Sequence, residues 1–312
     1  MSRHGELSFT GPATFFKAPL LDPGSGQGGH DVACLGVPYD FAVGYRPGAR
    51  FAPAAVRAAS GRLAWPEEGL YDLASDRRRL AGLGLVDLGD VDPLQLDAEA
   101  TFARITAAAR AARKTARLPV FVGGDHSISF PLLQAFDDEH DLHVVQFDAH
   151  LDFSDARNGT RLSNSSPFRR AFETSDGLTG RTVVGLRGMR ADEEAVAASR
   201  ELGHRLIRAD EVHDSLAEVL ARLPRGRRVY VSFDVDCLDP AELPGTSSPE
   251  PGGLSFRQLE VLLGAVIEHN ELLGLDLTEL APGLDPSGRS ELLAARVLAE
   301  SLAAWWDTAG HR

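Results

Sequence analysis

Three short clusters of acidic and histidine residues stand out because each one directly follows an apolar run. The apolar runs are Leu118–Val122, Leu142–Phe147 and Val229–Phe233. The clusters supply six candidate metal ligands: His126, Asp148, His150, Asp152, Asp234 and Asp236. Four carboxylates and two imidazoles without a thiolate suit Mn²⁺ or a similar divalent ion better than structural zinc.

Each apolar run predicts a buried strand, and each cluster lies where that strand passes into a loop. Ligands of open parallel sheets gather beyond the carboxyl ends of the strands, so the three clusters are expected to converge. An isolated Asp at a strand end is more often a helix cap or a turn residue. Six such residues together would leave crowded negative charge that is very costly without a cation. The pattern therefore predicts two metal ions, which together can hold a hydroxide at neutral pH and aim it at an electrophile.

Length and composition are those of an ordinary globular protein, with 312 residues, 43% hydrophobic and 25% charged. The formal net charge of −13 argues against nucleic acid as a partner, because nucleic-acid recognition needs a basic surface. The same charge suits a small cationic substrate, which an acidic cleft would attract, and it suits plain solubility equally well.

The two cysteines, Cys34 and Cys237, lie far apart in the sequence and do not form a disulfide framework. We expect a cytoplasmic protein, with no signal peptide at the start of the sequence and no apolar run long enough to span a membrane. Cys237 stands beside Asp236, and we interpret it as a small buried side chain rather than a reactive thiol.

We divide the chain into an N-terminal arm, residues 1–30, and a single domain, residues 31–312. The arm is rich in Gly, Pro and Ser and is expected to run irregularly over the surface. The predicted strands of the domain are Val32–Val37, Leu83–Leu88, Leu118–Val122, Leu142–Phe147, Thr182–Leu186, His204–Ile207, Val229–Phe233 and Leu272–Leu277. The predicted helices are Pro53–Gly61, Ala98–Lys114, Ser127–Asp137, Pro167–Glu173, Asp192–Leu202, Ala209–Leu223, Ser255–Glu268 and Ser290–Asp307.

This alternation predicts an α/β fold with a mostly parallel sheet of roughly eight strands and helices on both faces. A βα barrel shows the same alternation and stays open as an alternative.

Four blocks of the sequence resemble the ureohydrolases, the arginase/agmatinase superfamily, and the likeness extends from about Val32 to Trp306. The blocks are Gly36–Pro53 with Arg57, Gly123–Ser127, Phe147–Asp152, and Ser232–Pro240 with Pro244–Pro249 and Gly252-Gly253. The resemblance implies a three-layer α/β/α, arginase-like fold, a single ureohydrolase domain, and an assembly of identical subunits as a trimer or hexamer.

The resemblance also implies two Mn²⁺ ions per subunit, with Asp148 and Asp234 bridging them. One ion would take His126, Asp148, Asp152 and Asp234, and the other would take Asp148, His150, Asp234 and Asp236. Glu279, which follows the last predicted strand, matches the family glutamate that binds the guanidinium of the substrate. The implied reaction is hydrolysis of a small cationic guanidine.

The segment Gly44–Arg50 resembles the agmatinase form of the first block, and the loop 153–170 contains no arginase signature. The resemblance therefore implies hydrolysis of agmatine to putrescine and urea. The alternatives are a guanidino-acid hydrolase of the guanidinobutyrase kind, a related amide deacylase with a single zinc ion, and a catalytically weak paralogue that keeps its metals.

The chain departs from the family pattern at Asn164, where most members carry a histidine credited with proton transfer. Asn164 cannot carry a proton, and we assign it to the substrate-binding region. Asp152, a metal ligand with a free carboxylate oxygen, is the candidate to transfer the proton in its place.

Overall fold

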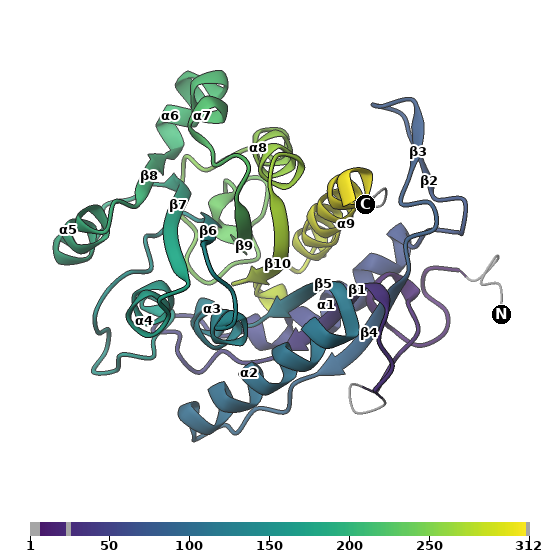
Figure 1. Cartoon of the computed structure of the whole chain (residues 1–312), viewed down its shortest axis with the longest axis horizontal. Helices are drawn as coiled ribbons and strands as arrows, with labels where there is room; N and C mark the ends of the chain where they lie inside the picture. Colours follow the sequence, from purple (N-terminus) through teal and green to yellow (C-terminus); the bar gives the residue numbers. More distant parts are fainter. Residues whose placement is uncertain (1–6, 23–25, 310–312) are drawn as a thin grey trace.

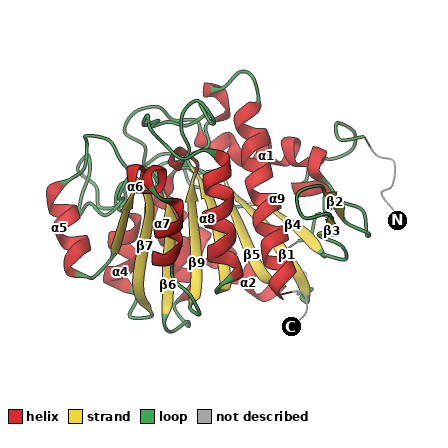
Figure 2. Cartoon of the chain, turned by 90° about the horizontal axis from the view of Figure 1, so that it is seen from above, coloured by secondary structure: helices red, strands yellow, loops and turns green. Residues whose placement is uncertain are grey.

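The computed structural model of the chain describes residues 7–22 and 26–309 and contains an eight-stranded parallel sheet flanked by helices (Figures 1 and 2). The order of the strands is β4-β1-β5-β10-β9-β6-β7-β8. These strands are β1 (His30–Val37), β4 (Leu85–Asp90), β5 (Ala116–Gly123), β6 (Leu142–Phe147), β7 (Leu178–Leu186), β8 (Arg205–Arg208), β9 (Arg228–Asp234) and β10 (Glu271–Thr278). All eight predicted strands are confirmed. The sheet is open, with β4 and β8 at its edges, which excludes the barrel.

The central strands are mostly apolar because both faces of the sheet are covered. In β1, Val32 and Cys34 pack into the core on one face, and Ala33 and Leu35 pack into the core on the other. This alternation follows from the period of two in a strand. Two separate apolar cores therefore hold the sheet between two layers of helices.

The helices are α1 (Ala52–Ser60), α2 (Ala98–Thr115), α3 (Ser129–Leu133), α4 (Pro167–Thr174), α5 (Glu193–Glu201), α6 (Ala209–Asp214), α7 (Leu216–Arg222), α8 (Phe256–Glu268) and α9 (Arg289–Ala309). One face of the sheet carries α1 and α6 to α9, and the other carries α2 to α5. This arrangement confirms the predicted three-layer α/β/α fold.

Two predicted helices are divided in the structure. The segment 209–223 forms α6 and α7, because Ser215 adopts an extended conformation between them and its side chain accepts a hydrogen bond at the start of α7. The segment 127–137 forms α3 between two short 3₁₀ turns. A two-stranded hairpin, β2 (Leu70–Asp72) and β3 (Arg77–Arg79), was not predicted, since its strands are short and mostly polar.

The described part of the N-terminal arm is partly buried, whereas the sequence predicted that it runs over the surface. Phe15 and Phe16 are buried in the same core as α1 and α9. The N–H of Phe15 donates to Asp87, and the N–H of Phe16 donates to Ser60. Residues 1–6 and 23–25 of the arm lie outside the described residues. The arm as a separate unit, and the domain boundary at residue 31, stay predictions.

Among the described residues, none of the helices is both long and apolar enough to cross a lipid bilayer.

Candidate metal centre

The six predicted ligands lie at the carboxyl ends of three strands near the middle of the sheet. His126 begins a 3₁₀ turn shortly after β5, Asp148 follows β6, and Asp234 is the last residue of β9. Glu279 directly follows β10, which lies between β5 and β9. The sheet therefore brings together segments that are more than 100 residues apart in the sequence.

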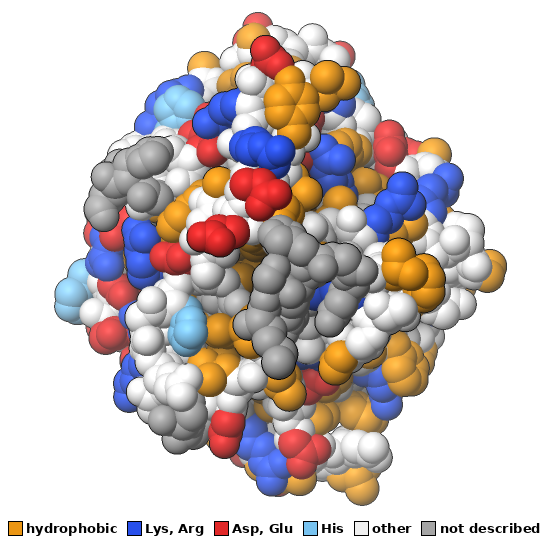
Figure 3. All heavy atoms as spheres, turned by 90° about the vertical axis from the view of Figure 1, so that its right-hand side faces the viewer, with side chains coloured by type: hydrophobic (Ala, Val, Ile, Leu, Met, Phe, Trp, Pro, Cys, Tyr) orange, Lys and Arg blue, Asp and Glu red, His pale blue; other side chains and the backbone are white. Residues whose placement is uncertain are grey.

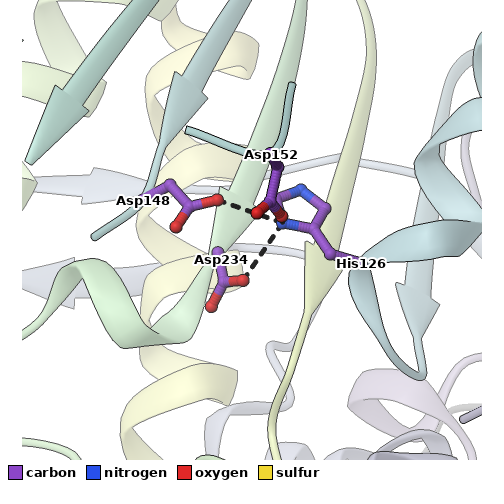
Figure 4. Close-up of side chains that lie close together, drawn as sticks. All are labelled: His126, Asp148, Asp152 and Asp234. Atoms are coloured by element: carbon purple, nitrogen blue, oxygen red, sulfur yellow. Dashed lines mark ion pairs between the residues drawn. The ribbon is translucent and has the colours of Figure 1, made fainter. Parts of the chain in front are cut away.

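One group of ligands surrounds a single nitrogen atom of His126 (Figure 4). Its Nδ1 lies 3.1 Å from Asp148 Oδ2, 3.0 Å from Asp152 Oδ2 and 3.1 Å from Asp234 Oδ2. All four side chains are buried or nearly so, with side-chain exposures between 0 and 10%. Three carboxylates and an imidazole thus share one small volume that is largely shielded from bulk water.

A second group of ligands shares Asp148 with the first. His150 Nδ1 lies 3.0 Å from Asp236 Oδ2 and 3.5 Å from Asp148 Oδ1. Asp148, His150 and Asp236 form a set that could hold an ion of its own. Asp148 therefore joins the two groups, whereas Asp234 belongs to the first group alone in this structure. Its expected role as a second bridge stays a prediction.

The tautomer of His126 is determined by a chain of hydrogen bonds behind the site. Ser232 donates its hydroxyl proton to Asp276 over 2.7 Å, so it can only accept from His126 Nε2, which lies 2.9 Å away. Asp276 also accepts from Tyr230 and Ser129. With its proton on Nε2, neutral His126 presents a bare Nδ1 to three carboxylates.

A bare Nδ1 among carboxylate oxygens needs a cation between them. Nδ1 is buried and has no hydrogen-bond partner among the described residues. Burial lowers the pKa of His126, but the carboxylates of Asp148, Asp152 and Asp234 raise it more, to well above its usual range. Burial and the neighbouring Asp236 likewise raise the pKa of Asp234 well above its usual range. Either a proton or a metal ion must balance this charge, and the oxygen-rich donor set fits a hard divalent ion.

Glu279 lies directly beside the first group and is held by three donors. Its Oε1 accepts from the backbone N–H of His126 at 2.9 Å and from Asn164 Nδ2 at 3.2 Å. Its Oε2 accepts from Ser247 Oγ at 2.6 Å. Burial is the main reason why the pKa of Glu279 is raised. The carboxylate is therefore firmly oriented at the inner end of the site.

Asn164, which the sequence assigned to the substrate-binding region, lies in the long loop before α4 and reaches the site. Asn164 lines the same cleft as Asp152, Asp234, Asp236 and Glu279. Its contact with Glu279 joins the loop before α4 to the end of β10. Six of the eight predicted site residues line this cleft: His150, Asp152, Asn164, Asp234, Asp236 and Glu279. The other two, His126 and Asp148, are buried next to them.

The cleft has a volume of about 410 Å³ and opens to solvent above the metal ligands. Its wall contains Glu250, whose Oε1 lies 4.0 Å from His150 Nε2. It also contains the arginines Arg157, Arg190 and Arg200, and none of the three forms an ion pair with a described residue. The wall outside the ligand groups therefore offers both signs of charge to a substrate.

Sequence reasoning missed several polar residues that support the site. Ser247, Ser232 and Asp276 were visible inside or beside the recognised motifs, but no function was assigned to them. Asp276 pairs with Ser232 across β10 and β9, and Ser232 pairs with Gln146 across β9 and β6. The sequence did contain a signal for Ser232 and Gln146, because each is a polar residue two positions before a candidate ligand at a strand end. Residues two apart in a strand share a face, so such a residue is expected to lie next to the ligand.

Comparison with known proteins agrees with this geometry. The Arginase family profile matches residues 30–304. Guanidinobutyrase from Pseudomonas aeruginosa is 34% identical over 307 residues, which cover 94% of this chain and 92% of that protein. Agmatinase from Bacillus anthracis is 34% identical over 279 residues, which cover 88% of this chain and 92% of that protein.

Solved structures of similar proteins point to the same family. Proclavaminate amidino hydrolase from Streptomyces clavuligerus superposes with a TM-score of 0.83 at 30% identity, covering 96% of this chain and 99% of that one. A hypothetical agmatinase from Burkholderia thailandensis superposes with a TM-score of 0.83 at 32% identity, covering 98% of this chain and 94% of that one. The chain therefore belongs to the arginase family and is a member of the ureohydrolase superfamily.

Proposed function

We propose that the protein hydrolyses a small guanidino compound with the help of two Mn²⁺ ions and releases urea. Agmatine, which would give putrescine and urea, is the first candidate substrate. The observation that carries the proposal is the pair of ligand groups joined at Asp148, with the oriented carboxylate of Glu279 beside them. A bound pair of divalent ions would supply Lewis acidity and lower the pKa of water, so that it can attack at neutral pH.

The protein residues position the substrate and move its protons. Glu279 accepts hydrogen bonds from the guanidinium and so fixes the carbon atom beside the ligand groups. Ser247 and Asn164 hold Glu279 in that orientation. Asp152 faces the cleft and is the residue we assign to proton transfer to the leaving amine. The contact with Glu279 gives Asn164 a function that does not require it to titrate.

Two features of the cleft bear on the substrate. Glu250 would attract the ammonium group at the far end of agmatine. Arg157 favours a second candidate, a guanidino acid, because it lines the cleft without forming an ion pair and could bind a carboxylate. Relatives named for guanidino acids are 34 to 36% identical to this chain and relatives named agmatinase are 34% identical, so identity alone does not choose between the two substrates.

A substrate panel tests the proposal. Urea release would be measured from agmatine, 4-guanidinobutyrate, 3-guanidinopropionate and arginine, with Mn²⁺ and after chelation. We expect Mn²⁺-dependent release, highest from agmatine. Highest release from a guanidino acid would instead establish the second candidate. No urea from any guanidine, with metal bound, would favour the paralogue that keeps metals without turnover.

Two substitutions refine the choice of substrate. If agmatine is the substrate, Glu250→Gln should raise its KM, and Arg157→Gln should leave it unchanged. If a guanidino acid is the substrate, the two variants should exchange their effects. Each variant thus serves as the matched control of the other.

Removing the shared ligand tests the metal assignment. Asp148→Asn replaces a charged oxygen donor that belongs to both groups, so we expect loss of bound Mn²⁺ and of turnover together. The metal content per chain, measured by mass spectrometry of the digested protein, checks this prediction. An active variant without metal would refute the assignment.

We also propose that the protein is a cytoplasmic homo-oligomer, a trimer or hexamer, that needs no nucleic acid or membrane partner. The proposal rests on the family resemblance and on the acidic net charge of −13. Native mass spectrometry of the purified protein measures the assembly directly, and a monomer at micromolar concentration would contradict it.

A further inference from the structure

Arg181, on β7, is a fully buried cation without a carboxylate partner. Its exposure is 1%, and no carboxylate of the described residues lies within ion-pair distance of it. Its guanidinium lies 4.4 Å from the ring centre of Phe168 and 5.1 Å from that of Phe153. Burial lowers the pKa of Arg181 to about 9, and the negative charges of Asp152 and Asp148 oppose that shift. An unpaired buried charge is costly, so its contacts call for an explanation.

The contacts of Arg181 lead to two metal-binding segments. Nε lies 3.0 Å from Gln146 Oε1, and Nη2 donates both to the same oxygen and to the backbone carbonyl of Leu151. Gln146 precedes the shared ligand Asp148 by two residues, and Leu151 directly precedes Asp152. One guanidinium thus connects a strand end with the loop that leaves it.

The orientation of the Gln146 amide follows from its neighbours. Arg181 has only donors, so the amide oxygen must face it, and the amide nitrogen must face the other way. That nitrogen lies 2.5 Å from Asp148 Oδ2. Gln146 is completely buried, so water cannot replace either contact. The amide therefore donates to the same carboxylate oxygen that faces His126 Nδ1.

We propose that Arg181 and Gln146 are positioning residues that fix the shared ligand Asp148, and the loop of Asp152, in the geometry that binds metal. Gln146 keeps Asp148 from rotating away, and Arg181 locks both the amide of Gln146 and the carbonyl of Leu151. This inference rests on the proposed metal-dependent function, but it concerns metal affinity rather than turnover. Residues that orient metal ligands typically change affinity about 10- to 100-fold when they are replaced.

Two conservative variants test the proposal. Gln146→Met keeps the volume of the side chain and removes its donor to Asp148. Arg181→Lys keeps the charge but loses the planar fork that reaches two acceptors at once. The full-length, Mn²⁺-loaded protein would be titrated with a chelating dye to obtain the Mn²⁺ affinity, and its thermal unfolding would be followed with and without metal. We expect each variant to bind Mn²⁺ about tenfold or more weakly than the wild type.

The double variant and a matched control separate positioning from general stability. Because Arg181 acts partly through Gln146, the double variant should lose less affinity than the product of the two single losses. Gln258→Met removes a glutamine from the first turn of α8, away from the cleft, and should lower the unfolding temperature without changing Mn²⁺ affinity.

Wild-type Mn²⁺ affinity in Gln146→Met and Arg181→Lys would overturn the proposal, even if their unfolding temperatures fall. A wild-type protein that binds Mn²⁺ but releases no urea would defeat the proposed function instead, and the affinity measurements would still decide this inference.

Discussion

Two site residues adopt left-handed backbone conformations that are unusual outside glycine. The φ angle is +50° at Asp152 and +63° at Glu279. Such conformations cost about 1–3 kcal/mol each and persist only where their surroundings hold them. For Glu279 the surroundings include a backbone hydrogen bond of 2.9 Å to Gly124 and the three donors to its carboxylate. A Cβ on Gly124 would lie 1.6 Å from the carbonyl oxygen of Tyr39, so only glycine fits there.

The charge of Glu279 can be removed without changing its shape. We expect Glu279→Gln to lower kcat/KM for the preferred guanidine by at least about a hundredfold, since a charge-assisted contact of several kcal/mol is lost. Steady-state urea release measures this effect. Glu242→Gln, outside the cleft lining, is the control and should match the wild type. Nearly unchanged urea release in Glu279→Gln would mean that Glu279 does not bind the guanidinium and has another function.

Asn164→His tests the departure from the family pattern. A histidine adds a group that titrates near neutral pH, within reach of Glu279. We expect the pH profile of kcat to gain a limb near pH 6.5 that the wild type lacks. An unchanged rate and profile would mean that this position does not take part in proton transfer.

At the scale of elements, α8 shows how local sequence determines where a helix begins. Ser255 Oγ accepts from the N–H of Gln258 at 3.3 Å, and Gln258 Oε1 accepts from the N–H of Ser255 at 3.0 Å. These two reciprocal hydrogen bonds form a capping box. The apolar side of α8, with Leu259 and Leu262, then packs on the sheet.

Removing the cap should destabilise the protein without affecting the cleft. We expect Ser255→Ala to lower the free energy of unfolding by about 1 kcal/mol. Urea denaturation of the metal-loaded protein measures it. Gln258→Ala should give a similar loss, and the double variant should lose less than the sum because the two side chains cap each other. An unchanged midpoint in Ser255→Ala would show that the cap contributes nothing.

At the scale of the whole molecule, charge is arranged differently on the face drawn in Figure 3 and inside the protein. Figure 3 shows acidic and basic side chains interleaved on the face that it presents, with apolar side chains between them. Inside the protein, four carboxylates concentrate negative charge in the two ligand groups.

Two histidines away from the ligand groups have pKa values that burial lowers. Burial and nearby arginines lower the pKa of His143 to about 4 and, with Arg181 the largest charge effect, that of His204 to about 3.

Acid should therefore weaken what His143 and His204 contribute to the stability of the folded protein. Below a pKa of about 6.5 the unfolded chain takes up protons on these histidines, while the folded protein does not until about pH 4 for His143. The contribution of these two histidines to the free energy of unfolding should fall as the pH drops from about 7 to 4. Relative to the wild type, His143→Gln should therefore gain stability as the pH drops through this range, measured by urea denaturation at each pH. Equal slopes in the two proteins would contradict the lowered pKa.

The sequence by itself determined the strands, the alternation with helices and the set of candidate metal ligands. Apolar runs such as Val229–Phe233 show by their composition that they are buried, and a cluster such as Asp148–Asp152 has a candidate ligand at every second position. Both signals are local, so they can be read without the fold. The divided helix at Ser215 and the buried Phe15 and Phe16 could not be read in this way, because each depends on what packs against the segment.

Tertiary structure alone decided which polar side chains act together. Arg181 and Gln146 are 35 residues apart, and neither stands inside a ligand cluster, yet the pairing of parallel strands brings them into contact. Asn164 and Glu279 meet across 115 residues. Hydrogen bonds depend on distances of a few tenths of an ångström, which follow from strand register and loop path and not from the identity of neighbouring residues.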